Sequence, residues 1–117
     1  MVNAILDTSF ILTCVRQKID FREELGLNGI SLIIPKQVIG ELNGLSKSDS
    51  NASLALQLIA KTNFKTIDLH TKNVDNGIIS YSKKHENLLV ATLDGNLAKQ
   101  VANSKIIIRQ KKKIMVR

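Results

Sequence analysis

Short apolar runs alternate along this chain with segments whose apolar residues recur at helical spacing. The runs have the length of β-strands and cover residues 2–6, 31–34, 65–68, 88–92 and 105–108. The helical patterns between them cover residues 8–16, 35–45, 51–61, 74–85 and 95–103, with a shorter helix over 19–27. Strands that alternate with helices predict an α/β fold with a mainly parallel, five-stranded sheet and helices on both faces.

Residues suited to helix starts support these assignments. Asp7 and Thr8 can cap the first helix, and Pro35 suits a first helical position. Ser50 or Asn51 can begin the helix over 51–61. We therefore expect a single domain over residues 1–108, followed by a basic tail or an extra strand over 109–117.

Four acidic residues depart from the pattern around them. Asp7 ends the first apolar run, and Asp94 follows the run over 88–92. Glu41 and Asp75 lie on helical faces that also carry apolar residues. A carboxylate that points toward a core is costly unless it is paired or bound to a metal ion. Four such residues, each from a different element, suggest one shared metal site.

The predicted topology brings these acids together. Successive parallel strands direct their C-terminal ends to one edge of the sheet, where the functional crevice of an open α/β sheet lies. Asp7 and Asp94 both follow a strand, and Asp75 opens the helix after the third strand. Glu41 reaches the same crevice only if its helix leans over it.

Oxygen ligands without Cys or His suit Mg²⁺ or Mn²⁺ better than zinc. Two such ions can activate a water molecule and stabilise the leaving oxygen of a phosphodiester. The pattern therefore indicates metal-dependent hydrolysis of a nucleic acid. Taken singly, Asp7, Asp75 and Asp94 also suit helix caps, and Glu41 suits a buried ion pair.

The other acidic residues have simpler interpretations. Asp68 ends the third predicted strand, where we expect a strand-end cap or a group near the crevice. The remaining acids have polar neighbours and are interpreted as solvated surface: Asp20, Glu23, Glu24, Asp49 and Glu86.

Charge and composition narrow the function classes. The net charge is +7, and residues 105–117 hold six basic and no acidic side chains. A basic segment either solubilises the chain or binds a polyanion, and the acidic site favours the polyanion. The single Cys14 lies among apolar residues, which indicates a buried thiol and excludes a disulfide framework. We expect no membrane segment and a cytoplasmic location.

The order and spacing of four segments resemble the PIN domain, a ribonuclease family. The segments are Leu6-Asp7-Thr8-Ser9, Pro35 to Leu42 around Glu41, Val74-Asp75-Asn76-Gly77-Ile78-Ile79, and Ala91 to Leu97 around Asp94. The resemblance covers nearly the whole chain. It also extends to small archaeal members and to PIN proteins of small-subunit rRNA processing. It implies a three-layer α/β/α sandwich and Mg²⁺- or Mn²⁺-dependent endoribonuclease activity.

The resemblance also implies roles for individual residues. Asp7, Glu41, Asp75 and Asp94 match the family's catalytic metal ligands. Ser9 and Thr92 match polar residues beside the site. Asn96 stands where many members have a further acid, and an amide there allows weaker metal binding or slower cleavage.

RNA recognition is expected to depend on phosphate contacts, because aromatic side chains for base stacking are few, at 3%. The candidate cations are Lys72, Lys99, Arg109, Lys111, Lys112 and Lys113.

Three functional classes remain open. The first is an endoribonuclease in rRNA processing or RNA turnover, or its close relative, the toxin of a toxin–antitoxin pair. The second is a non-catalytic PIN module that binds RNA or protein. The third, a receiver-like or nucleotide-binding domain, is weaker, since no Gly-rich phosphate loop follows a strand. RNA is the expected partner, with a homodimer and an antitoxin or ribosome-assembly protein as further candidates.

Overall fold

A computed structural model describes residues 2–109 and 113–117 and contains one five-stranded sheet. The strands are β1 (Val2–Leu6), β2 (Ile30–Ile33), β3 (Leu89–Ala91), β4 (Lys105–Arg109) and β5 (Lys113–Val116). Their spatial order is β2-β1-β3-β4-β5. Neighbours among the first four pair in parallel, and β5 pairs antiparallel with β4. The predicted mainly parallel, five-stranded sheet is confirmed.

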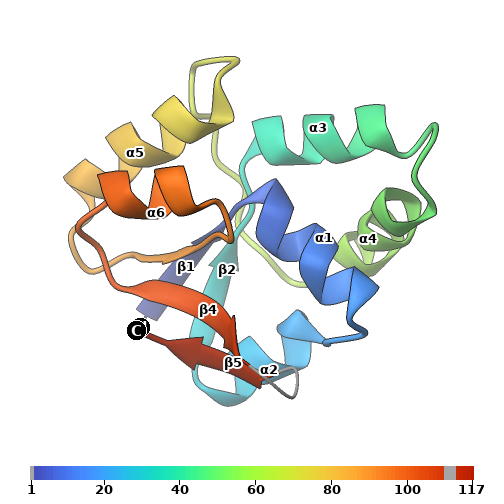
Figure 1. Ribbon diagram of the computed structural model, residues 1–117, viewed down its shortest axis with the longest axis horizontal. Coiled ribbons are helices and arrows are strands. Elements are labelled where there is room, and N and C mark those ends of the chain that lie inside the picture. The colour runs from blue at the N-terminus through green and yellow to red at the C-terminus, as the bar shows by residue number, and fades with distance from the viewer. Residues whose placement is uncertain (1, 110–112) are drawn as a thin grey trace.

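Helices cover both faces of the sheet, as predicted. They are α1 (Thr8–Arg16), α2 (Phe21–Leu27), α3 (Lys36–Leu45), α4 (Ser50–Ala60), α5 (Val74–Lys84) and α6 (Gly95–Gln100). Figure 1 shows α5 and α6 together on one side of the sheet, and α1, α3 and α4 grouped on the other. The central strand β1 is buried at Ala4, Ile5 and Leu6, which is why its sequence is continuously apolar.

The apolar core joins the two faces through large buried side chains, among them Phe10, Phe21, Ile78 and Leu97. Cys14 belongs to this core. Burial, together with the charge of Glu24, raises the pKa of the Cys14 thiol to about 12, so the thiol stays protonated. The prediction of a buried structural cysteine is confirmed.

The predicted strand over residues 65–68 is wrong, because this segment forms only an isolated bridge between Lys65 and Ile33. The segment runs beside β2, where backbone hydrogen bonds join Lys65 to Leu32 and Ile34, and the Ile67 carbonyl accepts from the Lys36 amide at the start of α3. Because the neighbouring backbone turns into a helix at Lys36, no extended partner remains for a ladder. The fifth strand is instead β5, near the C-terminus.

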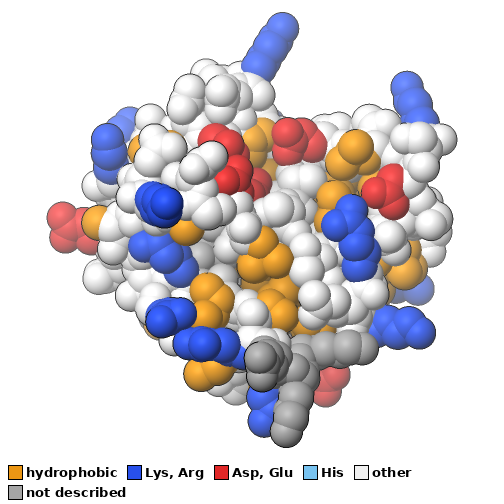
Figure 2. Space-filling view, in the orientation of Figure 1, with side chains coloured by type: hydrophobic (Ala, Val, Ile, Leu, Met, Phe, Trp, Pro, Cys, Tyr) orange, Lys and Arg blue, Asp and Glu red, His pale blue; other side chains and the backbone are white. Residues whose placement is uncertain are grey.

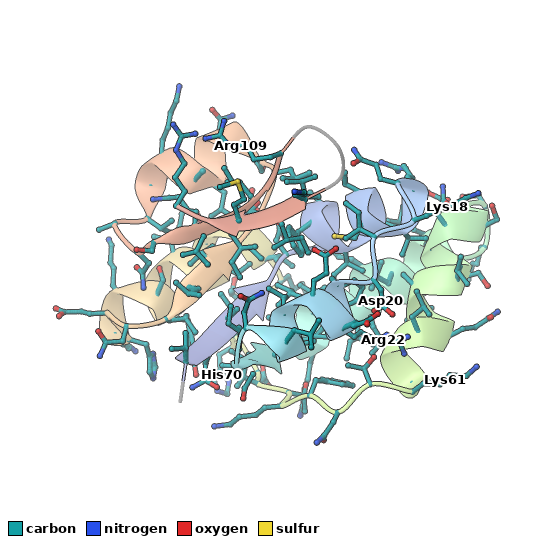
Figure 3. The ribbon with its side chains drawn as sticks, turned by 90° about the horizontal axis from the view of Figure 1, so that it is seen from below. Lys18, Asp20, Arg22, Lys61, His70 and Arg109 are labelled. Atoms are coloured by element: carbon teal, nitrogen blue, oxygen red, sulfur yellow. The ribbon has the colours of Figure 1, made fainter. Side chains whose placement is uncertain are left out.

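Two of the acids predicted to be solvated surface also cap helices: Asp20 is exposed, as predicted, whereas Asp49 is half-buried. The Asp49 carboxylate accepts a hydrogen bond from the Asn51 amide and lies 3.8 Å from the Arg16 guanidinium, so Asp49 caps α4 in place of Ser50 or Asn51. Asp20 caps α2 and pairs with Arg22, and the two side chains point toward each other in Figure 3.

Some helix ends also differ from the pattern. Pro35 is the N-cap of α3 rather than its first residue. Helix α6 ends at Gln100 rather than near 103, because the buried Asn103 side chain donates to the carbonyls of His85 and Leu88.

Among the described residues, no helix has both the length and the apolar character needed to cross a bilayer.

Candidate metal centre

Asp7 and Asp94 lie where two adjacent parallel strands end. Leu6 of β1 is in register with Ala91 of β3, and the Asp7 amide donates to the Ala91 carbonyl over 2.9 Å. From β1 the chain crosses to β2 on one side, whereas β3 leads to β4 on the other. This reversal of strand order is the place where ligands bind in open α/β sheets.

Asp7 is buried, with 5% of its surface exposed, and its carboxylate is held by three donors. Its Oδ1 accepts from the Thr8 amide over 2.8 Å, so Asp7 caps α1. Its Oδ2 accepts from the hydroxyls of Ser9, at 3.1 Å, and Thr92, at 2.9 Å. Three donors fix the orientation of this carboxylate.

Asp94 caps α6 and keeps one carboxylate oxygen available. Its Oδ1 accepts from the amides of Asn96, at 2.9 Å, and Leu97, at 3.3 Å. Within the described part of the chain, no hydrogen bond reaches its Oδ2. The alternative of a helix cap therefore holds for both Asp7 and Asp94, but it occupies only part of the Asp94 carboxylate.

Glu41 and Asp75 face the same region from α3 and α5. Glu41 is exposed rather than directed into the core, and its Oε1 accepts a hydrogen bond from the Thr8 hydroxyl. Asp75 is half-buried in the first turn of α5 and is not its cap, since Asn73 fills that position. The Thr8 contact is one that the sequence reasoning missed, because the local pattern presents Thr8 only as a cap.

Electrostatics link the four acids. Partial burial and then the charges of Asp7, Asp94 and Glu41 raise the pKa of the Asp75 carboxyl above its ordinary value. Carboxylates that repel one another in this way form a region that favours a cation. All the candidate ligand atoms are carboxylate oxygens, which suits Mg²⁺ or Mn²⁺.

The acids share this region without already standing at ligating distance. Across residues 2–109 and 113–117, no three Asp, Glu, His or Cys side chains have the spacing of a preformed metal site. Asp7 is fixed by its hydrogen bonds, whereas Glu41 is long and exposed. A cation held by all four acids would therefore require side-chain rotation.

An open depression of about 540 Å³ adjoins the acids and runs between α1 and α3. Its acidic end is formed by Asp7 and Glu41, and its other end is apolar at Leu12 and Leu45. Figure 2 shows acidic side chains gathered on this face of the molecule, with Lys and Arg side chains toward the β4–β5 edge of the sheet.

The residues expected beside the site fall into two groups. Ser9 and Thr92 contact Asp7 directly. Thr92 also accepts from the Asp94 amide over 3.1 Å, so one hydroxyl joins the ends of β1 and β3. Asn96 meets Asp94 only through its backbone amide, and its side chain is exposed.

The expected RNA-binding cations are dispersed over the surface. Lys72 is exposed in the loop before α5, and Lys99 is exposed in α6. Arg109 ends β4 and lies in register with Lys113, the first residue of β5. Lys111 and Lys112 lie outside the described residues.

Comparison with known proteins identifies the family of this chain. A family model described as a PIN-like domain matches residues 4–113. The chain belongs to this family. Ribonuclease VapC4 of Methanocaldococcus jannaschii is 32% identical to this PIN-like chain, over 96% of the chain and 94% of the relative. The resemblance predicted from the sequence is confirmed.

Solved structures share the PIN-like fold. The PIN domain endonuclease Utp24 matches with a TM-score of 0.84 and 27% identity, over 98% of this chain and 90% of that structure. VapBC2 from Rickettsia felis, solved with a promoter DNA fragment, matches with a TM-score of 0.56 and 16% identity, over 89% of this chain and 98% of that structure. This last likeness concerns the fold alone.

Proposed function

We propose that this PIN-like chain is an endoribonuclease that hydrolyses RNA phosphodiester bonds with Mg²⁺ or Mn²⁺ held by Asp7, Glu41, Asp75 and Asp94. The observation that supports this most is the raised pKa of Asp75, caused by burial and by the other three acids. Acids from four separate elements thus share one region at the point where the strand order reverses. The names of the relatives, a ribonuclease and an endonuclease, agree with the proposal.

The protein's own groups have distinct tasks in this proposal. Asp7 is the fixed ligand, because three hydrogen bonds hold it before any ion arrives. Asp94 would offer its Oδ2, and Glu41 and Asp75 would supply the further carboxylates that hold the ion. A divalent cation bound there would offset the clustered negative charge and polarise the scissile phosphate. The Thr8 hydroxyl donates to Glu41 and holds its carboxylate beside Asp7.

RNA would be held through its phosphates by Lys72, Lys99, Arg109, Lys111, Lys112 and Lys113. Arg109 and Lys113 lie opposite each other on β4 and β5, and cations in Figure 2 gather over these strands on the face that shows the acids. Phosphate contacts of this kind bind RNA without reading its sequence.

The test is cleavage of single-stranded and structured RNA in Mn²⁺, Mg²⁺ or EDTA by wild type, Asp7→Asn and Glu86→Gln. Glu86 is an exposed acid at the opposite end of α5 from Asp75 and serves as the matched control. We expect metal-dependent cleavage by wild type and Glu86→Gln, and none by Asp7→Asn, whose circular dichroism spectrum is unchanged. Equal cleavage by all three proteins would reject the proposal, and RNA binding without cleavage would identify a non-catalytic module.

The relationship to ribonuclease VapC4 favours a toxin as the second candidate role beside rRNA processing or RNA turnover. Controlled expression in a bacterial host separates the two. If the protein is a toxin, expression of the wild type should arrest growth and expression of Asp7→Asn should not. If it is a processing enzyme, the two cultures should grow alike.

A further inference from the structure

Gln37 connects the helix of Glu41 with the loop that leads to Asp75. It lies one helical turn before Glu41 in α3, so both side chains leave the same face of the helix. Its Nε2 donates to Oδ1 of Asp68 over 2.8 Å, and its Oε1 accepts from the Leu69 amide over 3.0 Å. Both ends of the amide are therefore occupied by the loop.

The loop in turn packs closely on α5. A Cβ atom at Gly77 would lie 2.8 Å from Cβ and 2.9 Å from Cδ1 of Leu69, and 3.0 Å from Cγ2 of Thr71. Only a residue without a side chain permits this approach. Gly77 follows Asp75 by two positions in α5, so a shift of Leu69 would be transmitted to the turn that holds Asp75.

Gln37 is the main connection beyond Ile67. Backbone hydrogen bonds join the 65–67 segment to Leu32, Ile34 and Lys36, and the last of them ends at the Ile67 carbonyl. Past that point, the bonds between α3 and the loop in the described residues are those of the Gln37 amide.

The loop conformation depends on the same hydrogen bonds. Asp68 Oδ1 also accepts from the His70 amide over 2.8 Å, and His70 has a left-handed backbone with φ of 57°. The hydrogen bond from Gln37, followed by that from His70, lowers the pKa of the Asp68 carboxyl. The charged Asp68 thus stabilises a turn that few side chains adopt by themselves.

We propose that Gln37 is a positioning residue that sets the distance between Glu41 and Asp75 across the metal centre. The inference rests on the proposed function. Glu41 and Asp75 enter the site from α3 and α5, and these helices lie on opposite sides of the sheet (Figure 1). A bridge from Gln37 through Leu69 to Gly77 restricts how far α3 and α5 separate. Because the two helices are already held in place, less conformational entropy is lost when an ion binds.

The experiment compares Mn²⁺ affinity by calorimetry in wild type, Gln37→Ala and Gln57→Ala. Gln57 is an exposed glutamine in α4 whose side chain makes no hydrogen bond to the loop in the described residues, and it is the matched control. Removing a direct hydrogen-bond partner of a metal ligand costs about 10–100-fold in metal affinity. Because Gln37 is more distant from the ion, we expect Gln37→Ala to bind Mn²⁺ about 3- to 10-fold more weakly than wild type. Amide hydrogen exchange of Leu69 and His70 in metal-free protein should accelerate in Gln37→Ala and remain at the wild-type rate in Gln57→Ala.

A rescue by reversed polarity distinguishes positioning from general stability. Gln37→Glu loses the donor and places a second carboxylate beside Asp68, so it should bind Mn²⁺ as weakly as Gln37→Ala. Combining it with Asp68→Asn supplies an amide nitrogen that can donate to the new carboxylate, while the amide oxygen can still accept from the His70 amide, so Mn²⁺ affinity should return to within about twofold of wild type.

Two results would overturn the proposal by themselves. One is wild-type Mn²⁺ affinity in Gln37→Ala, and the other is a double variant that stays as weak as Gln37→Glu while its thermal unfolding matches wild type. Wild-type protein that binds no Mn²⁺ and cleaves no RNA would instead reject the metal-dependent function itself, a distinct outcome.

Discussion

The hydroxyl of Thr92 donates a 2.9 Å hydrogen bond to Oδ2 of Asp7 and joins residues 85 positions apart in the sequence. The Thr92 hydroxyl oxygen also accepts a hydrogen bond from the Asp94 amide. One hydroxyl therefore orients two of the four acids, because it lies at the end of β3 beside the end of β1.

Replacing Thr92 by Val keeps the shape of this buried side chain and removes both hydrogen bonds. The absence of a donor to a buried carboxylate should lower the free energy of unfolding by about 1.5–3 kcal/mol. Metal affinity should fall about 10-fold or more, because Asp7 is no longer held in its orientation. Chemical denaturation and Mn²⁺ calorimetry measure the two effects.

Two further variants test whether the Thr92 hydroxyl is responsible. Thr92→Ser retains the hydroxyl and should keep most of the metal affinity. Thr66→Val changes an exposed threonine in the same chemical way and should alter neither property. Equal metal affinity in Thr92→Val and wild type would contradict the role assigned to this hydroxyl.

Asp75→Asn should stabilise the metal-free protein near neutral pH while abolishing its stabilisation by Mn²⁺. The native pKa of Asp75 is raised, so this residue favours folding below its unfolded pKa of about 3.9. That contribution is lost as the pH rises through the raised native pKa. The advantage of Asp75→Asn in EDTA should therefore shrink as the pH falls through the raised native pKa and be absent below about 3.9.

Asp20 provides the control of opposite sign for this prediction. The side-chain hydrogen bond from Arg22 is the main cause that lowers the pKa of Asp20. Asp20 therefore stabilises the folded protein above its unfolded pKa of about 3.9, and this stabilisation is lost as the pH falls through the lowered native pKa. Asp20→Asn should destabilise the protein at neutral pH. Thermal unfolding of both variants across pH 3–7 measures the contrast, and a destabilised Asp75→Asn would contradict it.

Gly77→Ala should destabilise the protein by about 1–3 kcal/mol, because its Cβ would overlap the fixed Cβ of Leu69. Gly40→Ala is the matched control in α3, where a Cβ would meet nothing within 4 Å. That change should stabilise the protein by roughly 0.5–1 kcal/mol, since alanine loses less backbone entropy in a helix. Urea denaturation measures both, and a neutral Gly77→Ala would show that the loop adjusts freely.

Arg109→Gln with Lys113→Gln should reduce the salt dependence of RNA binding. For single strands, the slope of log K against log salt should become shallower by roughly 0.7 for each phosphate that the protein no longer neutralises. Point changes are preferable to deleting residues 109–117, because deletion removes β5 and uncovers β4. Lys61→Gln is the control, at the opposite side of the molecule from Arg109 in Figure 3. A slope unchanged from wild type would leave these cations without a role in RNA binding.

Local patterns predicted most of the elements correctly, and one particular failure shows their limit. Residues 65–68 are as strand-like as those of β2, yet they form no strand, because the neighbouring backbone turns into α3. Residues 113–116 form the fifth strand, although their charge suggested a tail as readily. Strand pairing depends on a partner in space, which local sequence does not specify.

The sequence by itself determined the alternation of strands and helices, the buried Cys14 and the set of four acids, two after strands, one at a helix start and one within a helix. These follow from hydrophobic period and chain direction, which are local properties. Only the tertiary structure decided that Thr8 holds Glu41, that Asp75 is not a cap, and that Gln37 reaches Asp68. Such contacts join residues more than 30 positions apart, or depend on which neighbour fills the cap, so packing of the whole chain determines them.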